Sequence, residues 1–150
     1  MMPTDGQVLL LGRATSEHLL INVLRRTHPR ATDYWDGNWI SAHVRVRVGG
    51  FDGRADGELR AEELVAFRDQ LARLHATLTG EAVFQTMEEW LSVRLIGDGR
   101  GHIEAKAVLR DAPGIGNRLD FTLALDQTDL PTAMNALDGM CAAFPVISKP

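Results

Sequence analysis

The residues of this chain whose types and spacing best suit molecular recognition lie between positions 33 and 39. The segment Asp33-Tyr34-Trp35-Asp36-Gly37-Asn38-Trp39 holds two of the three Trp and the single Tyr, interleaved with short polar residues. Large aromatic side chains beside short polar ones either lock a turn onto the edge of a core or build a recognition surface. We expect Asn38 and Asp36 to hydrogen-bond to backbone in an Asx-type turn, with Trp35 or Trp39 packed on a sheet edge.

A second segment, Glu88-Glu89-Trp90, places two carboxylates beside a Trp. Acidic side chains next to an exposed Trp could anchor a basic partner, because the charge steers the encounter and the aromatic ring supplies contact area. The candidate partner contacts from the two segments are Asp33, Trp35, Asp36, Glu88, Glu89 and Trp90.

The remaining reactive residue types do not group into a catalytic pattern. The five His are scattered, with no pair at i,i+4 and no His-x-His spacing, and Cys141 stands alone at an apolar helical position. The glycine-rich stretches 97–101 and 114–116 precede expected strands, whereas a phosphate-binding loop should open a helix. The sequence therefore predicts no enzymatic activity, no metal site and no cofactor.

The hydrophobic periodicity predicts an α+β fold. Alternating or short apolar runs predict strands at 7–11, 18–24, 39–48, 51–59, 90–96, 102–110 and 119–125. The run at 18–24 also fits a short helix. Apolar residues at 3.6-residue spacing predict amphipathic helices at 62–78, ending at Gly80, and at 129–144. Short links favour one largely antiparallel, curved sheet of about six to eight strands. The strands at 39–48, 90–96, 102–110 and 118–125 should be adjacent, with both helices packed on the sheet.

Length and charge narrow the classes of function. With 150 residues, 45% hydrophobic and 24% charged, the chain fits one domain over 1–150 with a sizeable core. The formal net charge of -4 disfavours nucleic acid as a partner and mildly favours basic partners. The apolar run near the N-terminus is too short for a signal peptide or a membrane span. We expect a protein of a reducing, bacterial-type cytoplasm. The chain shows no internal sequence repeat.

Five segments together resemble one bacterial family. They are D-Y-W-D-G-N-W at 33–39, E-L-x-x-F-x-x-x-L at 63–71, T-M-E-E-W-L at 86–91, G-D-G-R-G-H at 97–102 and L-D-Q-T-D-L-P at 125–131. The chain is similar over about residues 30–146 to the WapI-type immunity proteins and to related actinobacterial proteins that share the first motif. The resemblance implies a protein that binds and blocks a cognate polymorphic toxin, often a nuclease.

Two hypotheses of different classes follow. The first is a non-catalytic immunity protein that neutralises a basic toxin domain. The alternative is a small cytoplasmic protein of another role that binds a small ligand or forms a homodimer through a sheet face.

Overall fold

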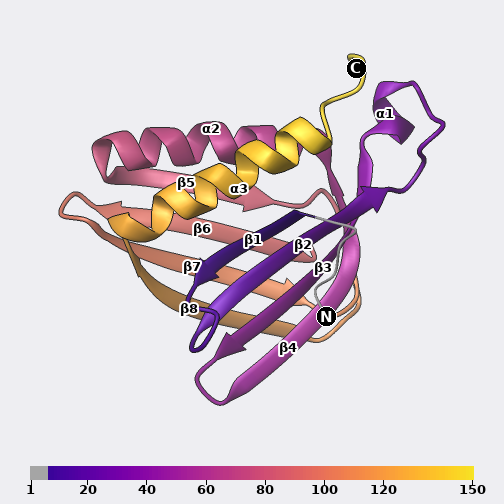
Figure 1. Cartoon of the computed structure of the whole chain (residues 1–150). Coiled ribbons are helices and arrows are strands. Elements are labelled where there is room, and N and C mark those ends of the chain that lie inside the picture. The colour runs from indigo at the N-terminus through magenta and orange to yellow at the C-terminus, as the bar shows by residue number, and fades with distance from the viewer. Residues whose placement is uncertain (1–6) are drawn as a thin grey trace.

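The computed structural model describes residues 7–150, which form an α+β fold of eight strands and three α-helices (Figure 1). The strands are β1 (Gln7–Gly12), β2 (His18–Arg26), β3 (Trp39–Val48), β4 (Phe51–Arg60), β5 (Thr79–Gln85), β6 (Leu91–Asp98), β7 (His102–Arg110) and β8 (Arg118–Asp126). The helices are α1 (Tyr34–Gly37), α2 (Ala61–Thr77) and α3 (Leu130–Ala143), the last preceded by the 3-10 turn η1 (Gln127–Asp129).

The chain repeats one topology twice. Four antiparallel strands in the order β1-β2-β3-β4 are followed by α2, and four more in the order β5-β6-β7-β8 are followed by α3. The sequence does not predict this repeat. The two halves follow the same path of strands and helix, but their residue patterns show no evident similarity.

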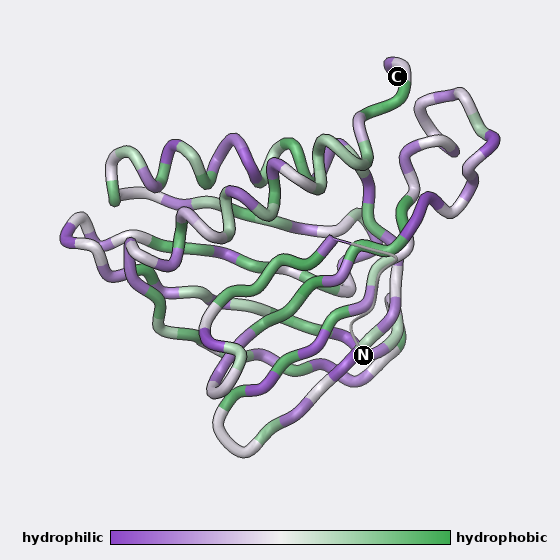
Figure 2. Tube along the Cα trace, viewed as in Figure 1, coloured by the Kyte–Doolittle hydropathy of each residue, from purple (hydrophilic) through white to green (hydrophobic). Residues whose placement is uncertain are grey.

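The strands form where apolar and polar residues alternate, and Figure 2 shows this alternation along the chain. In β3 the side chains of Ile40, Ala42, Val44 and Val46 are buried, while the residues between them lie on the outer face. The pairing of Val48 with Phe51 leaves a two-residue hairpin, and Gly49 takes the positive φ of 55° that such a turn needs. The ambiguous segment at 18–24 is a strand, as its short length favours.

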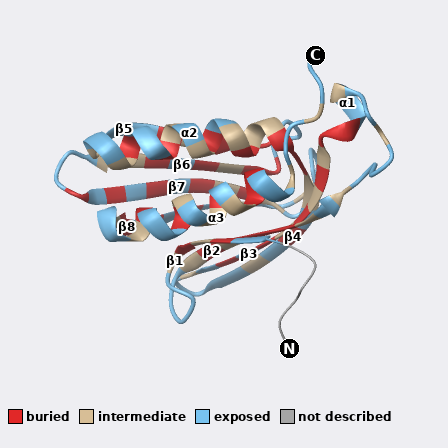
Figure 3. Cartoon of the chain, turned by 45° about the horizontal axis from the view of Figure 1, so that its top comes forward, coloured by how far each residue is buried: buried red, intermediate tan, exposed pale blue. Residues whose placement is uncertain are grey.

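The two long helices bury one apolar stripe each. In α2 the stripe consists of Leu64, Phe67, Leu71 and Leu74, and in α3 it includes Leu130 and Leu137. Helix α2 packs along β5, α3 packs along β1, and the two helices contact each other. Figure 3 shows buried residues on the inner sides of both sheets and helices, so the core lies between these layers.

Two details of the predicted architecture are wrong. The expectation of one sheet with β3 beside β6, β7 and β8 fails, because β3 belongs to the first sheet and the other three to the second. Strand β5 is absent from the prediction, because Thr79-Gly80 has the composition of a helix end. The helix instead ends with Leu78 in the left-handed region at φ 62°, donating its N–H to the Leu74 carbonyl, and Gly80 lies within β5.

Candidate functional site

Both candidate segments are attached to the first turn of α2. Arg60, which precedes the helix, donates two guanidinium hydrogen bonds of 2.8 Å to the carbonyls of Tyr34 and Trp35 in α1. Glu63, three residues later, accepts a hydrogen bond of 2.8 Å from the backbone N–H of Met87, in the turn between β5 and β6. Two stretches that are far apart in the sequence therefore meet at one end of the fold (Figure 1).

Arg60 is enclosed by the aromatic residues of the 33–39 segment. Only 1% of its surface is exposed. Its guanidinium carbon lies 4.8 Å from the ring centre of Trp39, 5.2 Å from that of Tyr34 and 5.6 Å from that of Trp35. Its Nε donates to a Glu62 carboxylate oxygen at 2.5 Å. A buried cation is stable only when it is paired and hydrogen-bonded. The 33–39 segment supplies carbonyl groups that accept its hydrogen bonds and aromatic rings that attract its charge. The motif therefore has a structural role first, as expected.

Sequence reasoning did not single out Arg60, although a signal for it existed. A two-residue hairpin at Gly49-Gly50 pairs residues symmetrically about it, and this register places Arg60 directly opposite Trp39. Extending the predicted hairpin by one pair thus places Arg60 beside Trp39, whereas its contacts with Tyr34 and Trp35 do not follow from the register.

Asn38 ties the same segment to the end of the chain. It is fully buried, and its side-chain amide donates to the carbonyls of Tyr34 and Ile147, both at 2.9 Å, while its Oδ1 accepts from the Ile147 N–H at 2.8 Å. The expected hydrogen bonding of Asn38 to backbone is confirmed, but the expected Asx-type turn is not formed, because the partners are Tyr34, four residues earlier, and the distant Ile147. For Asp36 the expectation is wrong: the carboxylate that caps α1 belongs to Asp33 and accepts the Asp36 N–H at 3.0 Å.

Glu63 is a half-buried carboxylate with two backbone donors. It accepts the N–H of Arg60 at 2.7 Å, which satisfies the N-cap amide of α2 as a Glu at this position does in a capping box, as well as the N–H of Met87. Burial raises the pKa of the Glu63 carboxyl to about 7, although both N–H groups and the Arg60 charge favour the ionised form. This anchor of the 86–90 turn therefore titrates close to neutral pH.

The expectation that Trp90 is exposed beside Glu88 and Glu89 is wrong. Trp90 is fully buried, and its indole N–H donates to the Glu58 carbonyl at 2.8 Å. Its ring lies over Gly57 of β4, where a Cβ on residue 57 would come within 2.3 Å of the ring. The 86–90 turn exposes its tip, while Trp90 joins the core and links the two sheets.

Four exposed carboxylates and two exposed apolar side chains lie at this end of the fold, and His28 and Arg30 are exposed in the loop just before Asp33. We call this surface the acidic end, and it consists of Asp33, Trp35, Asp36, Met87, Glu88 and Glu89. Trp35 is 58% exposed and Met87 55% exposed, both unusually high for large apolar side chains. Met87 was not among the predicted residues, since its exposure depends on how the turn is held by Glu63.

Other kinds of site find little support in the described part of the chain. Within residues 7–150 there is no group of three or more His, Cys, Asp or Glu side chains placed to hold a metal ion. Burial raises the pKa of the Cys141 thiol, which disfavours the reactive thiolate. None of the helices described is both long enough and apolar enough to cross a membrane.

The fold and the acidic end define a two-sheet α+β protein with a charged, partly apolar surface at one end. The chain belongs to the immunity protein WapI-like family, whose model matches residues 10–145, and this membership supports a non-catalytic role. No curated protein matches the chain. Among solved structures, the crystal structures of Trypanosoma bruciei MRP1/MRP2 are similar, with a TM-score of 0.49, 12% identity, and coverage of 95% of this chain and 86% of that chain.

Proposed function

We propose that this protein neutralises a cognate polymorphic toxin by binding it through the acidic end. Membership of an immunity protein family supports the binding of a toxin. The observation that supports the location is the exposure of Trp35 and Met87 among four exposed carboxylates, those of Asp33, Asp36, Glu88 and Glu89.

The chemistry of this surface fits a basic toxin domain, such as the substrate-binding face of a nuclease. Carboxylates steer a basic partner toward the surface, and desolvated aromatic and Met side chains supply most of the contact energy. Arg60 and Glu63 hold both segments in place before binding, so little conformational entropy is lost on association. Inhibition then requires contact alone and no reaction.

The experiment is co-expression with the toxin domain encoded beside this gene, followed by co-purification and binding kinetics. We expect the wild type to restore growth and to form a complex. The double variant Glu88→Lys with Glu89→Lys should slow association and weaken its salt dependence, and Trp35→Ala should speed dissociation.

The matched control reverses two carboxylates on the second sheet, Glu104→Lys with Asp120→Lys, which lie on the exposed face of strands β7 and β8. It should bind like the wild type. Equal loss in both double variants, with folding intact by circular dichroism, would refute the acidic end as the contact surface. Absence of both rescue and complex formation with the wild type would refute the immunity role for that toxin. The predicted homodimer remains a prediction, which light scattering of the purified protein can test.

A further inference from the structure

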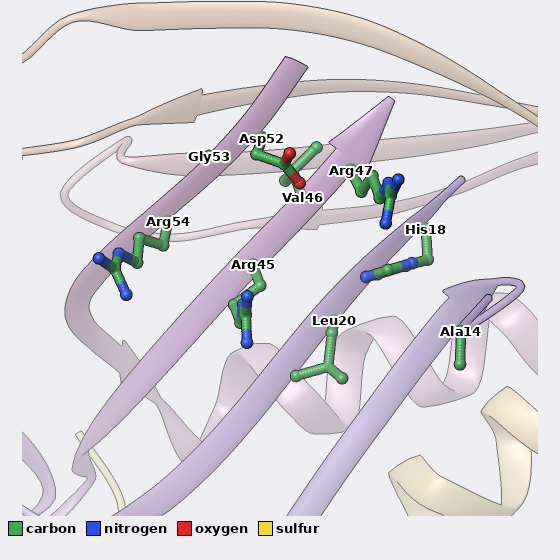
Figure 4. A pocket seen from close by; sticks show the side chains of 9 residues that line it. All are labelled: Ala14, His18, Leu20, Arg45, Val46, Arg47, Asp52, Gly53 and Arg54. Atoms are coloured by element: carbon green, nitrogen blue, oxygen red, sulfur yellow. The ribbon is translucent and has the colours of Figure 1, made fainter. Parts of the chain in front are cut away.

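A second distinctive surface lies on the outer face of the first sheet. It is a pocket of about 670 Å³ between strands β2, β3 and β4 and the turn that follows β1. Figure 4 shows the side chains that line it, including the basic residues His18, Arg45, Arg47 and Arg54. We call these four residues the arginine face. Strand β3 runs from Trp39, beside the acidic end, to this pocket.

The strand register concentrates positive charge here. Arg45 lies directly opposite Arg54 of β4, and Arg47 lies opposite His18 of β2 on one side and Asp52 of β4 on the other. Like charges placed directly opposite each other destabilise an antiparallel pair. The Arg45–Arg54 pair therefore does not stabilise the fold, and its presence calls for another explanation.

The charges of the arginine face are also not neutralised within the described residues. Between residues 7 and 150, no carboxylate oxygen lies within 4.0 Å of the guanidinium nitrogens of Arg45, Arg47 or Arg54. Asp52 is the one carboxylate among the residues that line the pocket. Three basic residues of the second sheet differ, because they face carboxylates in the pairs Arg94–Glu81, Lys106–Glu104 and Arg118–Asp120.

His18 is oriented by the neighbouring turn. Its Nδ1 lies 3.1 Å from the Arg13 carbonyl oxygen and 3.0 Å from the Ser16 carbonyl oxygen, so this nitrogen carries the hydrogen and donates it. The ring is thereby fixed, and Nε2 can donate to an anion in the pocket when both ring nitrogens carry a hydrogen.

We propose that the arginine face binds a compact anion of several charges, namely the phosphate chain of a nucleotide or an inorganic polyphosphate. Guanidinium groups match phosphate oxygens with paired hydrogen bonds. The pocket volume of about 670 Å³ lies in the range of small-molecule sites. Asp56 and Glu58 follow Arg54 along the same face of β4 and interrupt the positive surface, which favours a short anion over a long nucleic acid backbone. This site is separate from the acidic end and from the proposed immunity function.

The test is calorimetric titration of the full-length protein with inorganic tripolyphosphate at low and at moderate salt. The wild type should bind one equivalent. The double variant Arg45→Gln with Arg54→Gln should lose at least about tenfold in affinity, because each charge-assisted hydrogen bond contributes strongly. It should still fold, since it removes a repulsive pair. Arg94→Gln, which changes an exposed arginine of β6 in the second sheet, is the control and should bind like the wild type.

Two further ligands, ATP and single-stranded oligonucleotides, separate the possible sources of the anion. ATP binding at least as tightly as tripolyphosphate supports a site for the phosphate chain of a nucleotide, and tighter binding of tripolyphosphate supports an inorganic ligand. Binding of single-stranded oligonucleotides that strengthens with length would overturn the proposal in favour of a nucleic acid surface. No heat with ATP or tripolyphosphate, or equal loss in Arg94→Gln, would also overturn it. None of these outcomes bears on the proposed binding of a toxin at the acidic end.

Discussion

Replacing Arg60 by Met should be among the most damaging single changes in this protein. Met keeps an unbranched apolar stem but removes the guanidinium that lies 4.8–5.6 Å from the three aromatic ring centres. It also leaves the carbonyls of Tyr34 and Trp35 and the carboxylate of Glu62 without their donor.

The magnitude follows from these contacts. A hydrogen bond from a charged donor contributes about 1.5–3 kcal/mol, and a desolvated cation over an aromatic ring about 2 kcal/mol. These contributions share one side chain and do not add. Breaking a buried ionic interaction from one side costs about 3–5 kcal/mol, and we expect Arg60→Met to lower the free energy of unfolding by that amount. For a domain of this size the loss corresponds to a melting temperature lower by roughly 6–20 °C.

The assay is urea unfolding followed by Trp fluorescence, with near-ultraviolet circular dichroism to report the order of Tyr34, Trp35 and Trp39. Arg68→Met is the matched control, because Arg68 lies on the surface of α2 and pairs with Asp69 at 3.2 Å, with 36% of its side chain exposed. The control should change stability by less than about 0.5 kcal/mol. If Arg60→Met lowers the free energy of unfolding by less than about 1 kcal/mol and leaves the near-ultraviolet circular dichroism unchanged, the interactions around Arg60 do not hold the 33–39 segment in place.

The remaining predictions concern the neighbours of this cluster. Gly57→Ala should lower the free energy of unfolding by about 1–3 kcal/mol, because the new Cβ would lie 2.3 Å from the Trp90 ring. Gly50→Ala is the control, because a Cβ on residue 50 meets no atom within 4 Å. Trp90→Ala should lower the free energy of unfolding by about 3–5 kcal/mol, and Trp39→Ala should lower it less, because Trp39 is only half-buried. A larger loss for Trp39→Ala than for Trp90→Ala in urea unfolding would contradict this. The folded-state pKa of Glu63, about 7, lies above its ordinary value of 4.5, so the folded protein binds the proton more tightly. The free energy of unfolding of the wild type should therefore fall relative to that of Glu63→Gln as the pH rises from about 4.5 to about 7, and the difference should stay level above that. A difference between the two proteins that stays constant in urea unfolding across this pH range would refute the raised pKa of Glu63.

Local periodicity predicted most of the elements. The strand at 39–48 and the strand at 102–110 have the predicted bounds, and α2 and α3 begin and end within about one residue of the predicted helices. Side-chain alternation is a property of consecutive residues, so it needs no knowledge of the rest of the fold. The edge strand β5 escaped this method because only Ala82 and Phe84 of its seven residues are buried.

The division into two sheets could not be derived from the sequence. A hairpin sets the register of the two strands it joins, but α2 separates β4 from β5, and a helix of 17 residues sets no register between the strands on either side. One curved sheet and two separate sheets therefore have the same local pattern.

The candidate site divides in the same way. The sequence by itself determined that the 33–39 segment is a polar and aromatic turn with Asn38 bonded to the nearby Tyr34 carbonyl, because those residue types act on their near neighbours. The two hydrogen bonds between Asn38 and the distant Ile147 depend on tertiary structure. Tertiary structure decided that Arg60 fills the aromatic cluster, that Trp90 is buried against Gly57 and that Glu63 holds the 86–90 turn. Burial and pKa depend on which distant groups exclude water from a side chain, and that information exists only once the two sheets and α2 have packed together.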